Sequence, residues 1–287
     1  MVYLRSFTLP SLNSRELFIN DIKRTCYTSV YPFHLFPLQE LPEFTFEPIT
    51  IFCGGNGCGK STLLNVIAGK LGIAHDTAYN RSNFFEEYVN RCDYETHGSA
   101  AALRNGKIIT SDDVFEYLLN IRCLNEKIDY RRDDLLDEYT HAKKAGYTFK
   151  TMEDYEELKK FVDARRSTQS RYVRNRMMQN VPEQSNGESA LRYFTEAIEE
   201  NALYLLDEPE NSLSAVKQQE LVRFLSESAR FYGCQFIIST HSPFILSAPG
   251  ARLYDLDAAP PRVARWTELE NVRAYFDFFK EHQKAFD

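Results

Sequence analysis

The sequence predicts an α/β fold in which a mostly parallel sheet carries a helical insertion. Short apolar runs alternate with amphipathic helical patterns near both ends of the chain, as in βαβ units. A glycine-rich turn follows one of these runs, and a charge-rich helical stretch fills the middle of the chain. At 287 residues the chain is long enough for one large domain with an inserted subdomain. We therefore expect a core made of residues 1–111 and 185–287, with a helical insertion at 112–184.

Apolar runs predict the strands of the core. The segment "FTFEPITIFCGG" alternates and then becomes fully apolar, which is typical of a buried central strand. The segments "ALYLLDEPE" and "CQFIISTHSP" are short apolar runs that end in polar residues, and "ARLYDLD" after Pro249 predicts a late strand. Because a helical pattern separates the second run from the third, a parallel pair is expected.

Helical spacing predicts the helices that alternate with these strands. In "STLLNVIAGKLG" the residues Leu63, Leu64 and Ile67 share one face, and Gly72 is expected to end the helix. The segment "SLSAVKQQELVRFLSESARFYG" predicts an amphipathic helix closed by Gly233. The C-terminal "NVRAYFDFFKEHQKAFD" predicts a helix with an aromatic face.

The middle of the chain differs from the core in composition. It contains "DDVFEYLLNIRCLNEKIDYRRDDLLDEYTHAKKAG" and "TMEDYEELKKFVDARRSTQSRYVRNRMMQNVPE", which are charge-rich and helical with almost no strand signal. Gly146 and Pro182 interrupt the pattern, so we expect a helical insertion rather than a long coiled-coil arm.

Bulk composition narrows the class of protein. Hydrophobic residues make up 43% and charged residues 26% of the chain, an ordinary balance for a cytoplasmic protein, and no apolar run approaches a membrane span. Six cysteines without a CxxC pair favour buried free thiols over a zinc site or a disulfide framework. A net charge of -7 excludes a nucleic-acid-binding protein that is basic all over, but not a local basic patch.

The glycine-rich turn has the pattern of a phosphate-binding loop. Residues 54–61 read G-G-N-G-C-G-K-S, a full match to G-x-x-x-x-G-K-[ST] between a predicted strand and a predicted helix. In such a loop the backbone N–H groups surround phosphates, the lysine reaches the β- and γ-phosphates, and the serine hydroxyl is a ligand of Mg²⁺. We call residues 54–61 the phosphate loop and expect it to bind ATP with Mg²⁺. The expected nucleotide-binding residues are Gly54, Gly55, Asn56, Gly57, Cys58, Gly59, Lys60, Ser61 and Thr62.

Two acidic residues end the apolar run "LYLLDEPEN". Asp207 and Glu208 are expected at the carboxyl edge of the sheet, where α/β proteins bind their ligands. Asp207 suits a Mg²⁺ site together with Ser61, and Glu208 is the candidate general base that activates water. An acidic strand end at the surface is the simpler alternative for this motif taken alone.

His241 follows the next predicted strand, in "FIISTHSP". A single histidine is more often structural than catalytic, but this one is expected beside the strand that carries Asp207. We therefore favour a role as a sensor of the γ-phosphate, and we call residues 240–242 the switch turn.

A small polar turn precedes the helical pattern "QSNGESALRYFTEAIEE". Ser185, Asn186 and Gly187 stand at the start of this helix, where backbone donors and the helix dipole favour an anion. Ser185 and Glu188 also fit an ordinary capping box, and both interpretations can hold together. We call residues 185–188 the signature turn.

In this order and at about this spacing, the four motifs resemble those of the ATP-binding-cassette (ABC) superfamily of P-loop NTPases. The resemblance covers residues 1–111 and 185–257. It implies a homodimer in which the signature turn of one subunit contacts the ATP held by the other, with "ENSLS" from Glu210 at the dimer seam. S-N-G-E-S in place of LSGGQ looks more like the soluble bacterial "AAA family ATPase" branch near SMC, RecF and overcoming-lysogenization-defect proteins than like transporter ATPases.

Two expected parts of an ABC-type site have no clear match. The glutamine loop is replaced by "KIITSDDVF", where Asp112 or Asp113 takes the place of the glutamine. Tyr27, Tyr31 and Phe33 are candidates for stacking on adenine, although core packing explains aromatic residues equally well.

Three uses of such an ATPase compete. The first is a clamp on DNA or RNA in repair or phage defence, favoured by an arginine cluster before the signature turn: Arg165, Arg166, Arg171, Arg174 and Arg176. The alternative for this cluster is a solvated helix paired with nearby acids such as Glu153, Asp154, Glu156 and Glu157. The second use is an ATP-gated regulatory subunit of a separate nuclease or toxin, and the third is a transporter subunit.

Overall fold

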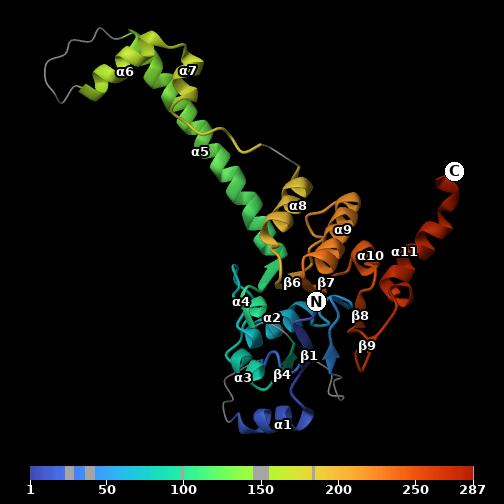
Figure 1. The fold of residues 1–287 in the computed structure, drawn as a ribbon. Coiled ribbons are helices and arrows are strands. Elements are labelled where there is room, and N and C mark those ends of the chain that lie inside the picture. The colour runs from blue at the N-terminus through green and yellow to red at the C-terminus, as the bar shows by residue number, and fades with distance from the viewer. Residues whose placement is uncertain (23–28, 36–42, 98–99, 145–154, 183–184, 287) are drawn as a thin grey trace. The chain divides into compact units, whose positions relative to one another are not determined.

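The chain forms two compact units. The computed structural model describes residues 1–22, 29–35, 43–97, 100–144, 155–182 and 185–286 (Figure 1). Met1–Phe115 and Asn186–Asp287 form one unit, which we call the core unit, and Glu116–Ser185 form the other, which we call the helical unit.

A six-stranded, mostly parallel sheet is the centre of the core unit. Its strands are, in spatial order, β5 (Lys107–Thr110), β6 (Leu203–Asp207), β7 (Gln235–Ser239), β3 (Ile49–Cys53), β8 (Arg252–Asp255) and β9 (Arg262–Val263). All neighbours pair in parallel except β9, which is antiparallel to β8. The predicted mostly parallel sheet is confirmed, and the expected central strand is β3, buried at all five positions.

The register of this sheet brings polar residues to one edge. Asp207 is paired with Ser239 of β7 on one side and with Thr110 of β5 on the other. Cys53, which leads into the phosphate loop, is paired with Asp255 of β8. Because parallel strands end at the same edge, the loops that follow β3, β6 and β7 emerge side by side.

A second, antiparallel sheet joins β2 (Phe44–Thr45), β1 (Leu4–Thr8) and β4 (Asp93–Thr96). Gln235, which is fully buried at the start of β7, ties β1 to the main sheet. Its Oε1 accepts hydrogen bonds from the backbone N–H groups of Tyr3 at 2.7 Å and Leu4 at 2.9 Å, and its Nε2 donates to the Leu4 carbonyl at 2.9 Å.

The helices of the core unit are α1 (Leu12–Asp21), α2 (Lys60–Leu71), α3 (Phe85–Asn90), α4 (Ala100–Arg104), α8 (Asn186–Ala197), α9 (Ala215–Phe231), α10 (Pro243–Leu246) and α11 (Glu270–Glu281), with short 3₁₀ turns at Trp266–Glu268 and Gln283–Ala285.

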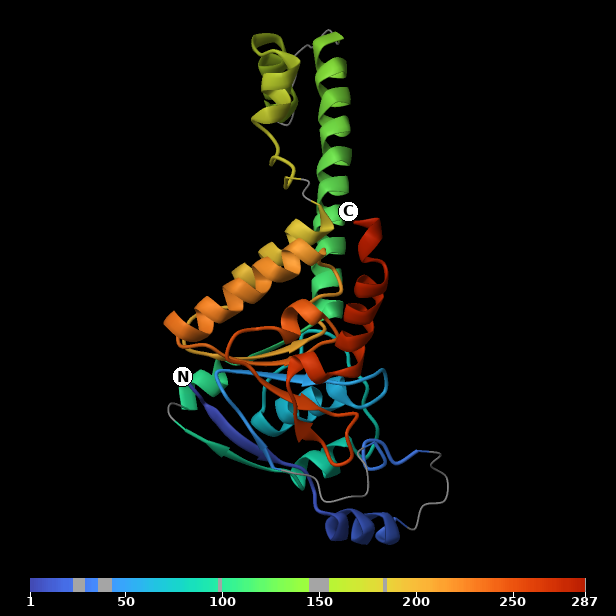
Figure 2. The same cartoon turned by 90° about the vertical axis from the view of Figure 1, so that its right-hand side faces the viewer.

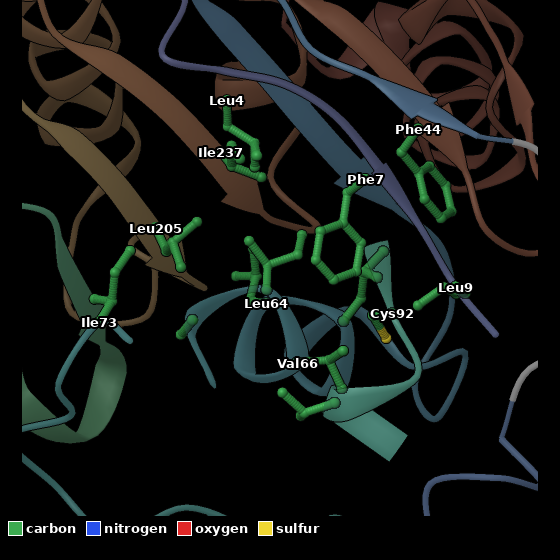
Figure 3. Packing of buried hydrophobic residues seen from close by; sticks show 14 of the residues in the cluster. Leu4, Phe7, Leu9, Phe44, Leu64, Val66, Ile73, Cys92, Leu205 and Ile237 are labelled. Carbon is green, nitrogen blue, oxygen red and sulfur yellow. The ribbon is translucent and has the colours of Figure 1, made fainter. Parts of the chain in front are cut away.

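Helix α2 packs against one face of the sheet and forms the main hydrophobic core. Gly59 and Gly72, both in the left-handed conformation, flank the helix, so its predicted end is confirmed. Figure 3 shows Leu64 among Phe7 of β1, Leu205 of β6 and Ile237 of β7, all fully buried. This packing fixes the helix that begins directly after the phosphate loop.

The opposite face of the sheet is covered by α8 and α9, which lie side by side (Figure 2). Alternate residues of β6 serve the two faces: Leu203 and Leu205 belong to the α2 cluster, whereas Tyr204 and Leu206 are buried outside it. Helix α9 is the predicted amphipathic helix, and Gly233 beyond its end has a φ of 66°.

The helical unit contains most of α5 (Ser111–Lys144), together with α6 (Tyr155–Arg166) and α7 (Gln169–Arg174). Leu135, Tyr139, Ala164, Tyr172 and Val173 form its small hydrophobic core. At 34 residues, α5 is about 50 Å long and corresponds to the first of the two stretches that the sequence predicts to be helical. Gly146 lies outside the described residues, and Pro182 follows the last helix of the unit.

Across the described segments, the helices include none with the length and apolar character needed to cross a membrane.

Replacing Gln235 with leucine is expected to destabilise the core unit by about 3 kcal/mol or more. The volume is similar, but the N–H groups of Tyr3 and Leu4 and the Leu4 carbonyl lose their partner while buried, and each such group costs about 1–3 kcal/mol. Urea unfolding of the two proteins measures the difference. The exposed Gln219→Leu is the matched control and should change stability by less than about 0.5 kcal/mol. An equally small effect at Gln235 would contradict the assigned role.

Candidate functional site

The phosphate loop follows β3 directly and has the backbone of an anion cradle. Gly54, Gly57 and Gly59 have φ values of 151°, 85° and 100°, a region that side chains disfavour. At Gly54 a Cβ atom would also lie 2.6 Å from the Cys58 Sγ, so that position is closed to larger residues. Cys58 is half-buried against the loop, and burial raises the pKa of its thiol.

Lys60 lies against the loop in this structure. Its Nζ donates hydrogen bonds to the carbonyl oxygens of Gly54 at 3.0 Å and Gly55 at 3.1 Å. The side chain is only 5% exposed, so the ammonium group already faces the inside of the cradle. The Gly55 N–H in turn donates to Asp257 Oδ2 at 2.6 Å, from the segment after β8.

Ser61 and Asp207 are in direct contact at the end of the phosphate loop. The Ser61 Oγ donates to Asp207 Oδ1 at 3.0 Å, and the hydroxyl of Ser239 donates to the same oxygen. Burial raises the pKa of the Asp207 carboxyl, and the two hydroxyl donors oppose this shift. A hydroxyl and a carboxylate oxygen are ligands that Mg²⁺ prefers, so the donor set fits that ion. The described residues contain no cluster of three His, Cys, Asp or Glu side chains that suits a metal.

Glu208 adopts a left-handed backbone conformation, with a φ of 47°. This is uncommon for a residue with a side chain and is often found at functional sites. The Glu208 Oε1 lies 3.3 Å from His241 Nε2, and Asn211 Nδ2 donates to its Oε2 at 3.0 Å. Both side chains of the Glu208–His241 pair are about one-third exposed, at 31% each. The carboxylate is therefore held in place yet open to solvent.

The switch turn is held by Glu210. The Glu210 Oε1 accepts hydrogen bonds from the Thr240 hydroxyl at 2.6 Å, from the His241 N–H at 2.7 Å and from the Ser242 N–H at 3.2 Å. Burial raises the pKa of this carboxyl, and these donors oppose the shift. The sequence placed Glu210 at a dimer seam; its contact with the switch turn was not predicted.

A cavity of about 590 Å³ opens beside the phosphate loop. Its walls include Gly55, His241 and Asp257, together with Asn271 and Tyr275 of α11. The C-terminal helix thus borders the predicted nucleotide site, which the sequence did not indicate. Asn271 Nδ2 donates to the carbonyl of His241 at 3.0 Å.

The signature turn stands at the start of α8. Asn186, Gly187 and Glu188 form the first turn of α8, and Ser185 precedes it. A Cβ atom at Gly187 would meet Ser212 and Ser214 at ordinary distances of 3.6 and 3.9 Å. Gly187 therefore packs on the segment that follows Glu210, and space within this chain does not require a glycine there.

The glutamine-loop and adenine candidates have other partners. Asp113 is buried, and its Oδ2 accepts from the Thr110 N–H at 2.7 Å and the Thr110 hydroxyl at 2.8 Å, while Asp112 is exposed. Phe33 is fully buried and stacks on Phe18 at 4.4 Å, so the core-packing alternative holds for it. The Tyr31 and Thr62 hydroxyls hydrogen bond to each other at 2.8 Å. Tyr27 lies outside the described residues.

Two members of the arginine cluster contact neighbouring side chains, although all five residues are exposed. Arg176 pairs with Asp163 at 2.6 Å and covers the ring of Tyr172, and Arg165 covers the ring of Phe161. The remaining three, Arg166, Arg171 and Arg174, are exposed and form no ion pair with the residues that the structure describes. Glu153 and Asp154 lie outside that part of the chain, as does the side chain of Glu156.

Sequence reasoning missed several members of the site. Ser239, Asn211, Asp257 and Asn271 all contact predicted residues. Ser239 and Asn211 stand inside the quoted motifs; the register of two parallel strands would have indicated Ser239, whereas Asn211 lies in the turn after β6. Asp257 ends the predicted late strand and Asn271 begins the predicted C-terminal helix, but neither segment carries a ligand motif, and only the fold brings them to the site.

Comparison with known proteins agrees with these motifs. A family model described as "AAA domain, putative AbiEii toxin, Type IV TA system" matches residues 132–247, which include Asp207, Glu208 and His241. The match covers less than half of the chain and does not include the phosphate loop. No curated protein matches the sequence.

Several solved structures are similar to the chain at low identity. An SMC head bound to the C-winged helix domain of ScpA is 14% identical, with 91% of this chain and 97% of that chain covered and a TM-score of 0.44. An SMC head domain from Thermotoga maritima is 13% identical, with 92% and 98% covered and a TM-score of 0.41. A dimeric post-hydrolysis state of an ATP-binding cassette bound to ADP and Pi is 13% identical, with 80% and 91% covered and a TM-score of 0.38.

Proposed function

We propose that this chain is a Mg²⁺-dependent ATPase of the ABC type. The observation that carries the proposal is the convergence behind the phosphate loop: Ser61 Oγ lies 3.0 Å from Asp207 Oδ1, and Glu208 Oε1 lies 3.3 Å from His241 Nε2. These four side chains come from α2, from the end of β6 and from the switch turn after β7. A hydroxyl, two carboxylates and an imidazole beside a phosphate cradle supply the groups that phosphoryl transfer to water needs.

Lys60, Ser61 and Asp207 would hold the nucleotide and its metal. The Lys60 ammonium would exchange its bonds to the Gly54 and Gly55 carbonyls for bonds to phosphate oxygens. Ser61 and Asp207 would hold Mg²⁺, which when bound neutralises charge on the phosphate oxygens. The free N–H groups at the start of α2 complete the anion site.

Glu208 would act as the general base. Its Oε1 would take the proton of the attacking water, and Asn211 on Oε2 keeps the carboxylate in position. His241 would lie between this base and the γ-phosphate and sense whether that phosphate is present. The left-handed backbone of Glu208 supports this role because such strain is kept where it serves a function.

A homodimer would complete the site. The signature turn of one subunit would contact ATP held on the phosphate loop of the other, in a two-fold sandwich with two ATP molecules at the seam. Gly187 supports this arrangement, since the packing within one chain does not require a glycine there.

For the biological role we propose DNA repair or phage defence, with an ATP-gated toxin or nuclease partner as the second candidate. The exposed Arg166, Arg171 and Arg174 favour a nucleic-acid clamp. The description of the matching family model, which names a toxin of a type IV toxin–antitoxin system, favours the second candidate. No observation on the structure favours the transporter subunit.

Glu208→Gln is expected to lower ATP turnover by at least about 100-fold while ATP binding persists, because it removes the base and keeps the cradle. Phosphate release and fluorescent-nucleotide titration measure the two quantities. Lys60→Ala is the contrasting variant, since it should weaken binding itself. Turnover at the parental rate in Glu208→Gln would show that the assigned base is wrong.

The same variant tests the dimer. Glu208→Gln should trap ATP at the seam, so light scattering with ATP and Mg²⁺ should report a dimer more strongly than for the parent. A monomer in every nucleotide state at tens of micromolar protein, roughly the range of weak association, would argue against the sandwich.

Asp207→Asn should raise the melting temperature at pH 7 to 8 in the absence of Mg²⁺ while abolishing turnover. The folded-state pKa of Asp207 is raised, so its contribution to stability is complete below the unfolded pKa near 4 and is lost as pH rises through the folded pKa. Asparagine carries no charge, so the variant does not lose this stability. Each kcal/mol of unfolding free energy gained should raise the melting temperature by about 2–4 °C. A pH series by scanning fluorimetry should show the gain disappearing towards acid pH. Mg²⁺ with ATP should stabilise the parent but not the variant; equal stabilisation would exclude Asp207 as a ligand.

Reversing the charge of Arg166, Arg171 and Arg174 to glutamate should abolish binding of DNA or RNA and leave basal ATP turnover nearly intact. In gel-shift titrations, the affinity of the parent for nucleic acid should fall steeply with salt, because each neutralised phosphate releases counterions. The affinity should depend little on base sequence, because contacts to phosphates do not read the bases. Arg176 is left unchanged because it packs on Tyr172 and pairs with Asp163.

The matched control makes the same charge change at Arg104, Arg223 and Lys284, which are exposed in the core unit. Binding should survive in the control. No shift of the parent at low salt, with or without ATP, would favour the effector candidate, which a pull-down of partner proteins then tests.

A further inference from the structure

The switch turn has no regular structure of its own, and one carboxylate oxygen organises it. Thr240, His241 and Ser242 lie between β7 and α10, outside any helix or strand. All three donate to Glu210 Oε1, at 2.6, 2.7 and 3.2 Å. The other oxygen, Oε2, is buried and accepts no hydrogen bond from the residues that the structure describes. The Thr240 N–H also donates to the Phe52 carbonyl at 3.2 Å, and the Ser242 N–H also donates to Thr240 Oγ1 at 2.9 Å. Glu210 Oε1 is thus the acceptor that all three residues share, and it is the one that binds the His241 N–H.

The opposite side of the turn is also held by side chains. The His241 carbonyl accepts from Asn271 Nδ2 of α11 at 3.0 Å, so both backbone polar groups of His241 are fixed from outside the turn. The Ser242 hydroxyl donates to Gln218 Oε1 of α9 at 2.6 Å. The backbone of His241 has no freedom to move without breaking these bonds.

Glu210 belongs to the same turn as the proposed base. The Glu208 N–H donates to the Ser239 carbonyl at 3.0 Å, and the Leu213 N–H donates to the Glu210 carbonyl at 2.9 Å. This turn therefore presents two carboxylates to one histidine: Glu208 faces the ring and Glu210 holds the backbone. A shift of Glu210 would change the separation of Glu208 Oε1 and His241 Nε2.

We propose that Glu210 is a positioning residue, which sets His241 relative to Glu208 and so controls the rate of ATP hydrolysis without contacting the nucleotide. This role rests on the proposed ATPase function. Because one oxygen makes all three bonds, an acceptor is needed at that point and a negative charge is not. Glutamine can place its carbonyl oxygen at Oε1 and its amide at the unpartnered Oε2 position, whereas alanine and methionine cannot supply the acceptor.

Glu210→Ala and Glu210→Gln in the full chain test the proposal with two measurements. Amide hydrogen exchange of His241 should accelerate at least about tenfold in Glu210→Ala, because its N–H loses its acceptor, and should stay slow in Glu210→Gln. The kcat for ATP should fall about 10- to 100-fold in Glu210→Ala with KM nearly unchanged, as for a misplaced catalytic group, and should be restored in Glu210→Gln. Glu220→Ala, which removes a carboxylate that pairs with Lys217 on α9, is the control and should change neither measurement.

Other results would overturn either the positioning role of Glu210 or the proposed ATPase function. Parental kcat in a folded Glu210→Ala, or a Glu210→Gln as impaired as Glu210→Ala, overturns the positioning role. Glu210→Met preserves the length of the side chain and replaces the alanine variant if that variant does not fold; failure of both to fold assigns Glu210 to stability alone and also overturns it. If the parent neither binds nor hydrolyses ATP, the proposed function fails, while the exchange measurement still tests whether Glu210 holds the turn.

Discussion

The parallel pairing of β3, β7 and β6 is the constraint on which the candidate site depends. It aligns Phe52 with Ser239 and Ser239 with Asp207, so the loops that follow three distant segments leave the sheet at one edge. The hydrophobic packing on both sides of these strands fixes that register, because a slip by one residue would exchange the side chains packed against α2 with those on the opposite face. The short distances between Ser61, Asp207, Glu208 and His241 follow from this alignment rather than from any local sequence.

Buried carboxylates give the site its electrostatic character. Asp207 and Glu210 both have raised pKa values because of burial, and hydroxyl or backbone donors compensate each of them only in part. A cation beside Asp207 would offset the desolvation cost of its negative charge. In Glu210, the donors of the switch turn bind one carboxylate oxygen, and the other has no hydrogen-bond partner among the described residues. The first carboxylate is thus suited to bind a ligand and the second to hold a loop, although only two residues separate them in the chain.

The fold could largely be predicted from the sequence where a periodic pattern reported burial. The fully apolar "ITIFC" gave a central strand, and the helical spacing before Gly72 gave the helix after the phosphate loop. The small second sheet was not predicted, because β2 has only two residues and β4 is exposed at all four positions, so neither strand shows a buried apolar run.

For the candidate site, the sequence by itself determined the groups that lie close together along the chain and form a recognisable motif. These groups are the glycines and Lys60 of the phosphate loop, and the adjacent Asp207 and Glu208 at the end of one strand. Only the tertiary structure decided which partners these groups meet. Glu210 holds the switch turn, Asn271 reaches His241 from the last helix, Asp257 contacts Gly55, and Phe33 belongs to the core instead of a nucleotide pocket. The physical reason is that a local motif fixes backbone conformation over a few residues, whereas contacts between segments tens to hundreds of residues apart depend on strand order, register and helix packing, which no single segment encodes.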